Sequence, residues 1–189
     1  KIRLNLQWNA ALKQKPSDIR EEILRELEEK NNTPFNRIKN STEYTPLDWK
    51  EASEMLTSGT IDIGSHTHTH SILTRCLPAQ KREELMTSKQ LIEKNTGIPC
   101  DLFCYPNGEE GDFDEETNKL LKEMGFSCAL TTLQGFNDCS SNIYTLKRIG
   151  ISNQDDKIQF VMKLYGVISF LSRIKQKITS IIQCANGDE

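Results

Sequence analysis

The side chains best suited to chemistry are the three histidines of the chain, His66, His68 and His70, which fall within five positions. They follow residues 60–64, a short segment whose composition predicts a β-strand ending at a glycine. Imidazole is the commonest metal-ligating side chain near neutral pH, and a spacing of four residues places His66 and His70 on one face of a helical turn. We therefore expect these two residues to bind one metal ion, with His68 turned away. The alternative is a polar loop whose histidines only cap neighbouring backbone groups.

A catalytic zinc site usually has three protein ligands and an open position for water, so two histidines leave one ligand to be found. The carboxylates of Asp112 and Asp114 are candidates because they lie in a neighbouring loop. Asp114, however, precedes an expected helix and is typical of a helix N-cap. Asp155 and Asp156 precede another expected helix, where acids usually complement the helix dipole.

The segments around these residues alternate between helices and strands. Helices are expected at about residues 17–30, 46–58, 78–95 and 114–124, and strands at 60–64, 101–105, 127–132 and 144–149. The second of these helices is expected to have Thr45 as its N-cap and Pro46 as its first residue. The alternation predicts an α/β fold with a parallel sheet or barrel, in which chemistry collects at the C-terminal ends of the strands.

The C-terminal region, residues 154–189, differs from the rest of the chain in its charge. The 189 residues contain 24 Lys+Arg and 27 Asp+Glu, a net charge of −3 that excludes a generally basic nucleic-acid-binding protein. Residues 157–187 contain five basic side chains and no acidic one. Apolar residues from Phe160 to Ile178 recur every three or four positions, which predicts a long, basic amphipathic helix. We expect this helix to pack on the domain or on a partner, or to lie on an anionic membrane surface.

Two further features concern processing and compartment. The chain begins with Lys1 and shows no signal-peptide pattern, so we expect a processed or truncated protein. Its six cysteines form no CxxC pair and no regular framework, which favours free thiols in a reducing compartment. Together these features favour a cytoplasmic location.

Three motifs resemble those of the polysaccharide deacetylase family, which is also called the NodB homology domain or carbohydrate esterase family 4. They are Ile-Gly-Ser-His-Thr-His-Thr-His at 63–70, Leu-Phe-Cys-Tyr-Pro-Asn-Gly at 102–108 with Gly-Asp-Phe-Asp at 111–114, and Leu-Lys-Arg-Ile-Gly-Ile at 146–151. The resemblance runs from about residue 44 to 170. It implies a partial deformed β/α barrel at 44–153, a lead-in at 1–43 similar to a helical insertion of some members, and the C-terminal helix at 154–189.

The resemblance implies that the chain hydrolyses acetyl groups of an acetylated polysaccharide or oligosaccharide. Its histidine pair, His66 and His70, would bind a divalent metal, usually zinc. The segments beside this pair would bind substrate through Thr67, Tyr105 and Pro106.

Two further roles follow from the same resemblance. Asn107 falls where a backbone N–H stabilises the oxyanion, which agrees with the general need for a preorganised donor beside a Lewis-acidic metal. Cys104 occupies a position that is often arginine in the family, and Arg148 is expected to take over that arginine's role.

The sequence also departs from the family pattern. No Asp-Asp motif precedes His66, so the third metal ligand and the general base have no counterpart, and no histidine follows His70 to act as general acid. Both tryptophans lie upstream of His66, which leaves another family motif unmatched. We therefore expect the C-terminal portion of a metal-dependent deacetylase with little activity by itself. The alternatives are a non-catalytic glycan- or metal-binding protein that keeps the histidine pair, and an interaction module dominated by the basic helix.

Overall fold

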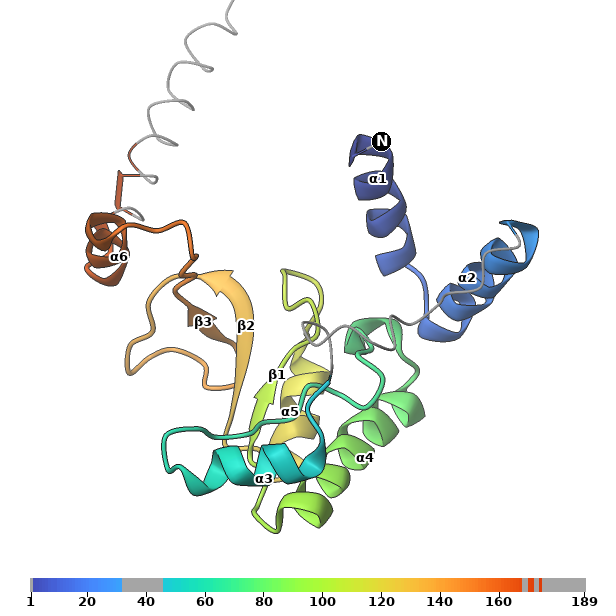
Figure 1. Cartoon of the computed structure of the whole chain (residues 1–189), viewed down its shortest axis with the longest axis horizontal. Helices are drawn as coiled ribbons and strands as arrows, with labels where there is room; N and C mark the ends of the chain where they lie inside the picture. The colour runs from blue at the N-terminus through green and yellow to red at the C-terminus, as the bar shows by residue number, and fades with distance from the viewer. Residues whose placement is uncertain (1, 32–45, 168–169, 172–173, 175–189) are drawn as a thin grey trace, which may run out of the picture.

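The computed structural model describes residues 2–31, 46–167, 170–171 and 174 (Figure 1). Its helices are α1 (Ile2–Lys13), α2 (Ser17–Asn31), α3 (Trp49–Thr57), α4 (Pro78–Thr96), α5 (Glu115–Glu123) and α6 (Lys157–Leu164), with one 3₁₀ turn at Leu73–Arg75. Its strands are β1 (Leu102–Cys104), β2 (Cys128–Gln134) and β3 (Leu146–Arg148). The sequence predicted each of these elements except α1 and the 3₁₀ turn.

The three strands form a parallel sheet in the order β1-β2-β3. Phe103 of β1 is opposite Ala129 of β2, and a parallel bridge joins Ser65 to Phe103 on the free edge of β1. Within the described residues the sheet stays open and does not close into a barrel. This arrangement confirms the predicted α/β fold, a partial barrel of parallel strands alternating with helices.

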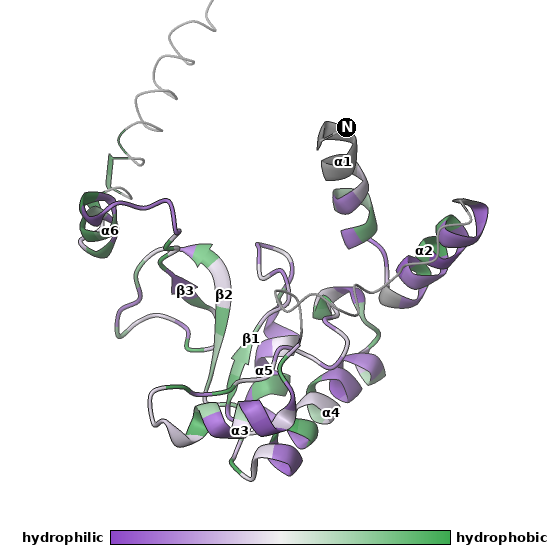
Figure 2. Cartoon of the chain, in the orientation of Figure 1, coloured by the Kyte–Doolittle hydropathy of each residue, from purple (hydrophilic) through white to green (hydrophobic). Residues whose placement is uncertain are grey.

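The hydrophobic core lies between the sheet and the helices α4 and α5. Figure 2 shows that β1 and β2 are largely hydrophobic, whereas the outer surfaces of α4 and α5 are hydrophilic. Phe103 of β1 contacts both Tyr105 and Phe126 in edge-to-face geometry, with ring centroids 5.1 and 5.5 Å apart. The other buried members of this core are Leu73, Leu85, Ile92, Cys100, Leu120, Leu121 and Ala129. Because β1 and β2 pack against this core, it holds their C-terminal ends and the site residues there in place.

The start of α3 differs from the sequence prediction. Asp48, and not Thr45, is its N-cap: the Asp48 carboxylate accepts the Glu51 N–H at 2.8 Å, and the Glu51 carboxylate accepts the Asp48 N–H at 2.9 Å. This reciprocal capping box satisfies two backbone donors, so the helix begins at Trp49 and excludes Pro46. Thr45 itself lies outside the described residues.

The predicted strand at 60–64 is reduced to the single bridge at Ser65. Ser65 donates its N–H to the carbonyl of Leu102 at 2.8 Å and accepts the N–H of Cys104 at 2.9 Å. Gly64 permits this close approach, because a Cβ at that position would lie 2.9 Å from the Leu102 carbonyl oxygen. The segment is therefore held against β1 at one residue, immediately before the histidines.

The expected long C-terminal helix is interrupted. The helix α6 begins at the N-cap Asp156 and ends at Leu164, where Tyr165 and Gly166 form a turn and Gly166 has a φ of 72°. The apolar repeat continued through this turn, so periodicity alone gave no sign of the break. The rest of the prediction, at residues 175–189, lies outside the described residues. No helix in the described part of the chain is long and apolar enough to cross a bilayer.

Candidate active site

The first histidine is fixed by the end of β1. Nδ1 of His66 lies 2.6 Å from the carbonyl oxygen of Cys104. A ring N–H that donates to this carbonyl places the proton on Nδ1 and leaves the lone pair of Nε2 available, which is the usual arrangement of a metal-ligating histidine.

The second histidine lies beside the first. The ring centroids of His66 and His70 are 4.8 Å apart, and the ring planes are inclined by 72°. Two imidazoles bound to one zinc ion have centroids roughly 5 Å apart, because each Zn–N bond is about 2.0–2.1 Å. The two side chains therefore fit as ligands of a single ion.

The backbone that brings these rings together is a loop, so the expected helical turn was wrong. Thr67 and His70 both have positive φ, at 64° and 60°, a conformation that non-glycine residues seldom adopt. The chain reverses at these two left-handed residues, and the reversal brings the rings together. The sequence had predicted that a helical turn would do so. His68 is exposed to solvent, as are His66 and His70, but its ring contacts neither of theirs in the described structure.

Glu84 on α4 holds this loop. Its Oε2 accepts hydrogen bonds from the backbone N–H groups of His68 at 2.9 Å and Thr69 at 2.8 Å, and its Oε1 accepts the Thr69 hydroxyl at 2.6 Å. Sequence reasoning missed Glu84, because it is one of several acids on an amphipathic helix and no local motif distinguishes it.

Thr67, between the two histidines, has a buried hydroxyl oxygen with no hydrogen-bond partner among the described residues. Buried polar atoms are almost always paired, and an unpaired one usually indicates a missing ligand, ion or water. The position of Thr67 beside the histidine pair is therefore consistent with a ligand-binding role.

Cys104 and Arg148 converge on the same place from the ends of β1 and β3. The nearby Cys104 thiol raises the pKa of His66 more than burial lowers it. His66 in turn lowers the pKa of the Cys104 thiol, and the Arg148 guanidinium lies near enough to lower the pKa of both groups. Arg148 thus contributes positive charge at the C-terminal edge of the sheet.

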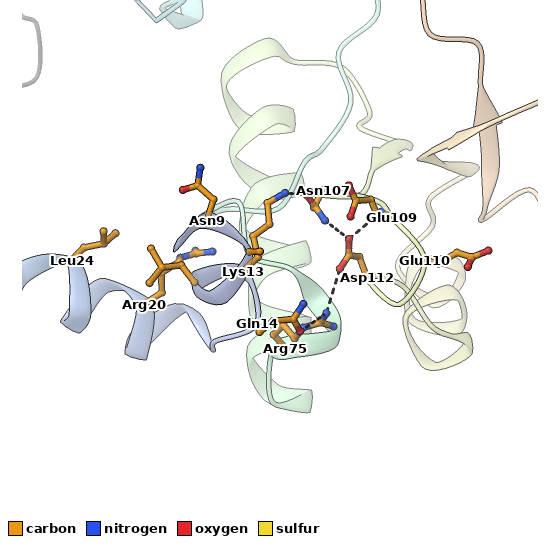
Figure 3. Close-up of a pocket in the computed structure, with 12 residues that line it drawn as sticks. Asn9, Lys13, Gln14, Arg20, Leu24, Arg75, Asn107, Glu109, Glu110 and Asp112 are labelled. Carbon is orange, nitrogen blue, oxygen red and sulfur yellow. Dashed lines mark hydrogen bonds and ion pairs between the residues drawn. The ribbon is translucent and has the colours of Figure 1, made fainter. Parts of the chain in front are cut away.

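Asn107 lies in the loop after β1 with a φ of 63° (Figure 3). Its side-chain amide donates to Asp112 at 2.5 Å and accepts a hydrogen bond from Nζ of Lys13 on α1 at 2.5 Å, while its backbone carbonyl accepts the Thr132 hydroxyl at 2.8 Å. Among the residues that the structure describes, none accepts a hydrogen bond from the backbone N–H of Asn107, the group expected to stabilise the oxyanion.

Asp112 supports this loop and is not a free acid. Its side chain is 4% exposed, forms an ion pair with Arg75 at 3.5 Å, and accepts hydrogen bonds from the Asn107 amide and the Glu109 N–H. Both carboxylate oxygens already have partners, Oδ1 in Arg75 and Oδ2 in the loop. Asp112 is therefore a poor candidate for the third ligand or for the base.

Asp114 is the N-cap of α5, as predicted from the sequence, and its carboxylate accepts the Thr117 N–H at 2.7 Å. Within the described ranges no group of three or more His, Cys, Asp or Glu side chains could hold a metal ion. A metal ion held by the histidine pair would therefore need a further ligand.

Tyr105 and Pro106 lie in the core. The Tyr105 side chain is 1% exposed, and its hydroxyl lies 2.8 Å from the Asn118 side-chain oxygen and 3.0 Å from the Tyr144 carbonyl. Burial raises the pKa of this hydroxyl far above its usual value. Because both side chains are fully buried, a glycan could contact this segment only through its backbone.

Comparisons with known proteins identify the family. A model of the family described as polysaccharide deacetylase matches residues 10–129. The match begins within α1, upstream of the resemblance expected from residue 44, and it ends before Arg148. No curated protein sequence matches the chain significantly.

Solved deacetylases share the fold. The deacetylase PplD of Streptococcus pyogenes, solved in complex with acetate, superposes with a TM-score of 0.58 at 20% identity over 65% of this chain and 52% of its own. A polysaccharide deacetylase from Bacillus cereus gives a TM-score of 0.56 at 29% identity over 66% of this chain and 38% of its own. The chain thus spans about half the length of the first protein and less of the second. Since the family model covers well over half of the 189 residues, the chain belongs to the polysaccharide deacetylase family.

Proposed function

We propose that the chain contributes the histidine pair of a metal-dependent deacetylase that removes acetyl groups from an acetylated glycan. The observation that carries this proposal is the adjacency of His66 and His70, with Nδ1 of His66 against the Cys104 carbonyl. Both imidazoles would hold a divalent ion, with zinc favoured by nitrogen ligands. When bound, such an ion acts as a Lewis acid and makes water a stronger nucleophile at neutral pH.

The neighbouring residues suit the other needs of acetyl hydrolysis. Negative charge develops on the acetyl oxygen, and preorganised donors or cations stabilise it. We assign two groups to that oxygen: the N–H of Asn107, which has no acceptor among the described residues, and the guanidinium of Arg148. We also assign Thr67 to substrate binding, because its buried hydroxyl has no hydrogen-bond partner among the described residues.

A third ligand and a general base are needed in addition. Since Asp112 is committed to Arg75 and Asn107, we propose that both come from carboxylates outside the described residues. Loss of a general base alone typically lowers a rate by about 10²–10⁴-fold. The chain by itself is thus expected to hydrolyse acetyl groups slowly. The alternative is a non-catalytic glycan- or metal-binding protein, which would bind without turnover.

The test measures zinc content and acetate release on the same preparations. Acetylated chitooligosaccharides and acetylated xylan distinguish N-acetyl from O-acetyl substrates. We expect the chain to bind zinc and to release acetate slowly, and the joint variant His66→Ala/His70→Ala to do neither. Zinc uptake without any acetate release would favour the binding alternative. Rapid turnover that Asp112→Asn abolishes would show that Asp112 is the base after all.

We also propose that α6 contacts an anionic membrane surface. Apolar side chains of α6 and of its C-cap face solvent, with Ile158 70% and Tyr165 81% exposed, while Lys163 forms an ion pair with Asp155 at 2.6 Å. The excess of basic residues in 157–187 favours anionic lipid over a neutral surface. Co-sedimentation with vesicles containing phosphatidylserine tests this contact, and equal sedimentation with neutral vesicles, or none with either, would contradict it.

A further inference from the structure

A cavity of about 600 Å³ lies between the α1–α2 hairpin and the loop 107–112 (Figure 3). This volume is typical of sites for small molecules. The cavity lies near the histidine pair: Asn107 in its lining comes three residues after Cys104, whose carbonyl oxygen lies 2.6 Å from Nδ1 of His66. The proposed reaction assigns no role to α1 or α2, and among the residues that line the cavity it uses only Asn107.

The cavity is lined by three basic side chains and three acidic ones, Glu109, Glu110 and Asp112, but only one ion pair forms among them in the described structure. Arg75 and Asp112 neutralise each other at 3.5 Å. The ammonium of Lys13 contacts only the neutral Asn107 side chain, and the guanidinium of Arg20 has no hydrogen bond or ion pair with another described residue. Figure 3 shows Lys13 and Arg20 on the wall formed by α1 and α2, Glu109 beside Asn107 on the facing loop, and Glu110 directed away.

The remaining wall suits a sugar. The amide of Asn9 and the apolar side chains of Leu12 and Leu24 line the same cavity. Amides hydrogen-bond hydroxyl groups, and apolar side chains pack against the C–H face of a pyranose ring. A planar guanidinium with free donors matches a carboxylate in bidentate geometry, which a neutral hydroxyl cannot reproduce.

We propose that this cavity binds the carboxylate of an acidic sugar in the glycan, through Arg20 and Lys13, beside the sugar whose acetyl group faces His66 and His70. The proposal gives the proposed deacetylase a substrate class, an acidic glycan. It rests on the proposed function only in stating that the neighbouring sugar carries the acetyl group. Binding itself requires neither metal nor turnover.

The experiment titrates the metal-free chain with two matched tetrasaccharides and follows NMR shifts. Hyaluronan tetrasaccharide alternates glucuronate with N-acetylglucosamine, and chitotetraose contains N-acetylglucosamine alone. A charge-assisted hydrogen-bond pair supports an affinity roughly tenfold higher for the acidic ligand. Arg20→Gln and Lys13→Gln should remove that preference. Arg82→Gln should retain it, because Arg82 pairs with Glu123 on α5, away from the cavity.

Arg20→Lys tests whether charge alone is sufficient, because lysine keeps the positive charge but lacks the planar pair of donors. We expect this variant to lose most of the preference for the acidic tetrasaccharide. Equal affinity for both tetrasaccharides, no binding of either, or a preference that survives Arg20→Gln would overturn the proposal. Free acetate binding as tightly as hyaluronan would also overturn it, since the cavity would then bind any carboxylate and not an acidic sugar. Acetate release is measured separately, so failure of the proposed reaction leaves this result interpretable.

Discussion

Glu84 binds Thr69 through both of its carboxylate oxygens: Oε2 accepts the backbone N–H at 2.8 Å and Oε1 accepts the hydroxyl at 2.6 Å. This clamp fixes the loop between the two histidines to α4 without touching either imidazole. Because ligand orientation depends on such supporting contacts, Glu84 is a positioning residue for the proposed metal site.

Glu84→Gln should weaken zinc binding by about 10–100-fold, the usual cost of losing a contact that orients a metal ligand. The amide keeps one acceptor oxygen and replaces the other by a donor that cannot accept the N–H groups or the hydroxyl. Zinc affinity is measured by competition with a chromophoric chelator. Glu83→Gln is the matched control, because Glu83 is exposed on the same helix. Equal zinc affinity of the two variants would show that the clamp does not position the histidines.

His66→Ala and His70→Ala should each abolish zinc uptake, whereas His68→Ala should leave it unchanged. The rings of His66 and His70 are adjacent, whereas the His68 ring contacts neither of them in the described structure. Metal analysis after dialysis gives the stoichiometry. Loss of uptake in His68→Ala, with its thermal unfolding unchanged, would mean that a different pair of histidines binds the ion.

The sequence predicted the fold well because its signals are local and mutually consistent. Gly97 as the end of α4 and Asp114 as the N-cap of α5 follow from residue preferences that the structure retains. The start of α3 was misplaced because two capping signals, at Thr45 and Asp48, compete within four residues. Periodicity likewise gave no sign of the turn at Gly166.

The site was harder to predict because its parts come from distant segments. The histidine motif is local and was found, but the Glu84 clamp joins residues fifteen or sixteen positions apart. Lys13 and Asn107 are separated by 94 positions, and nothing in α1 marks it as part of a site. Asp112 was considered as a base because a sequence does not show that Arg75 and Asn107 occupy its oxygens.

Asp114→Asn should destabilise the chain at pH 7 and destabilise it less at pH 3. Burial alone would raise the pKa of Asp114, but hydrogen bonds from Thr117 and the nearby Lys81 ammonium outweigh it, so the pKa lies below its usual value. A depressed carboxyl pKa stabilises the fold above the unfolded value of about 3.9, and this stability is lost as pH falls through the folded pKa. Asparagine still caps the helix, so the loss is the charge opposite buried Lys81.

We expect this Asp114→Asn difference to be about 1 kcal/mol, because the carboxylate is partly exposed and therefore screened. Urea unfolding at pH 7, 5 and 3 measures it. Glu115→Gln, at an exposed position in the same helical turn, provides the control. A difference that stays constant across this pH range would exclude a charge effect.

Gly108→Ala should destabilise the loop that carries Asn107. Gly108 has a φ of 68°, and a Cβ there would lie 2.9 Å from the backbone nitrogen of Thr132 and 3.3 Å from the Tyr105 carbonyl oxygen. The loop would have to move away from β2 and lose the hydrogen bond between the Thr132 N–H and the Gly108 carbonyl. Left-handed strain and the clash together should cost about 2–4 kcal/mol in free energy of unfolding.

Gly111→Ala separates these two effects in the same loop. Gly111 also has a positive φ, at 87°, but a Cβ there would meet nothing within 4 Å, so only the backbone strain of about 1 kcal/mol applies. Urea unfolding should therefore rank Gly108→Ala as clearly less stable than Gly111→Ala. Because Asn107 adjoins Gly108, acetate release should also fall further in Gly108→Ala than in Gly111→Ala. Equal stability of the two variants would mean that the loop can leave β2 at no cost, which would contradict the close packing of Gly108 against Thr132.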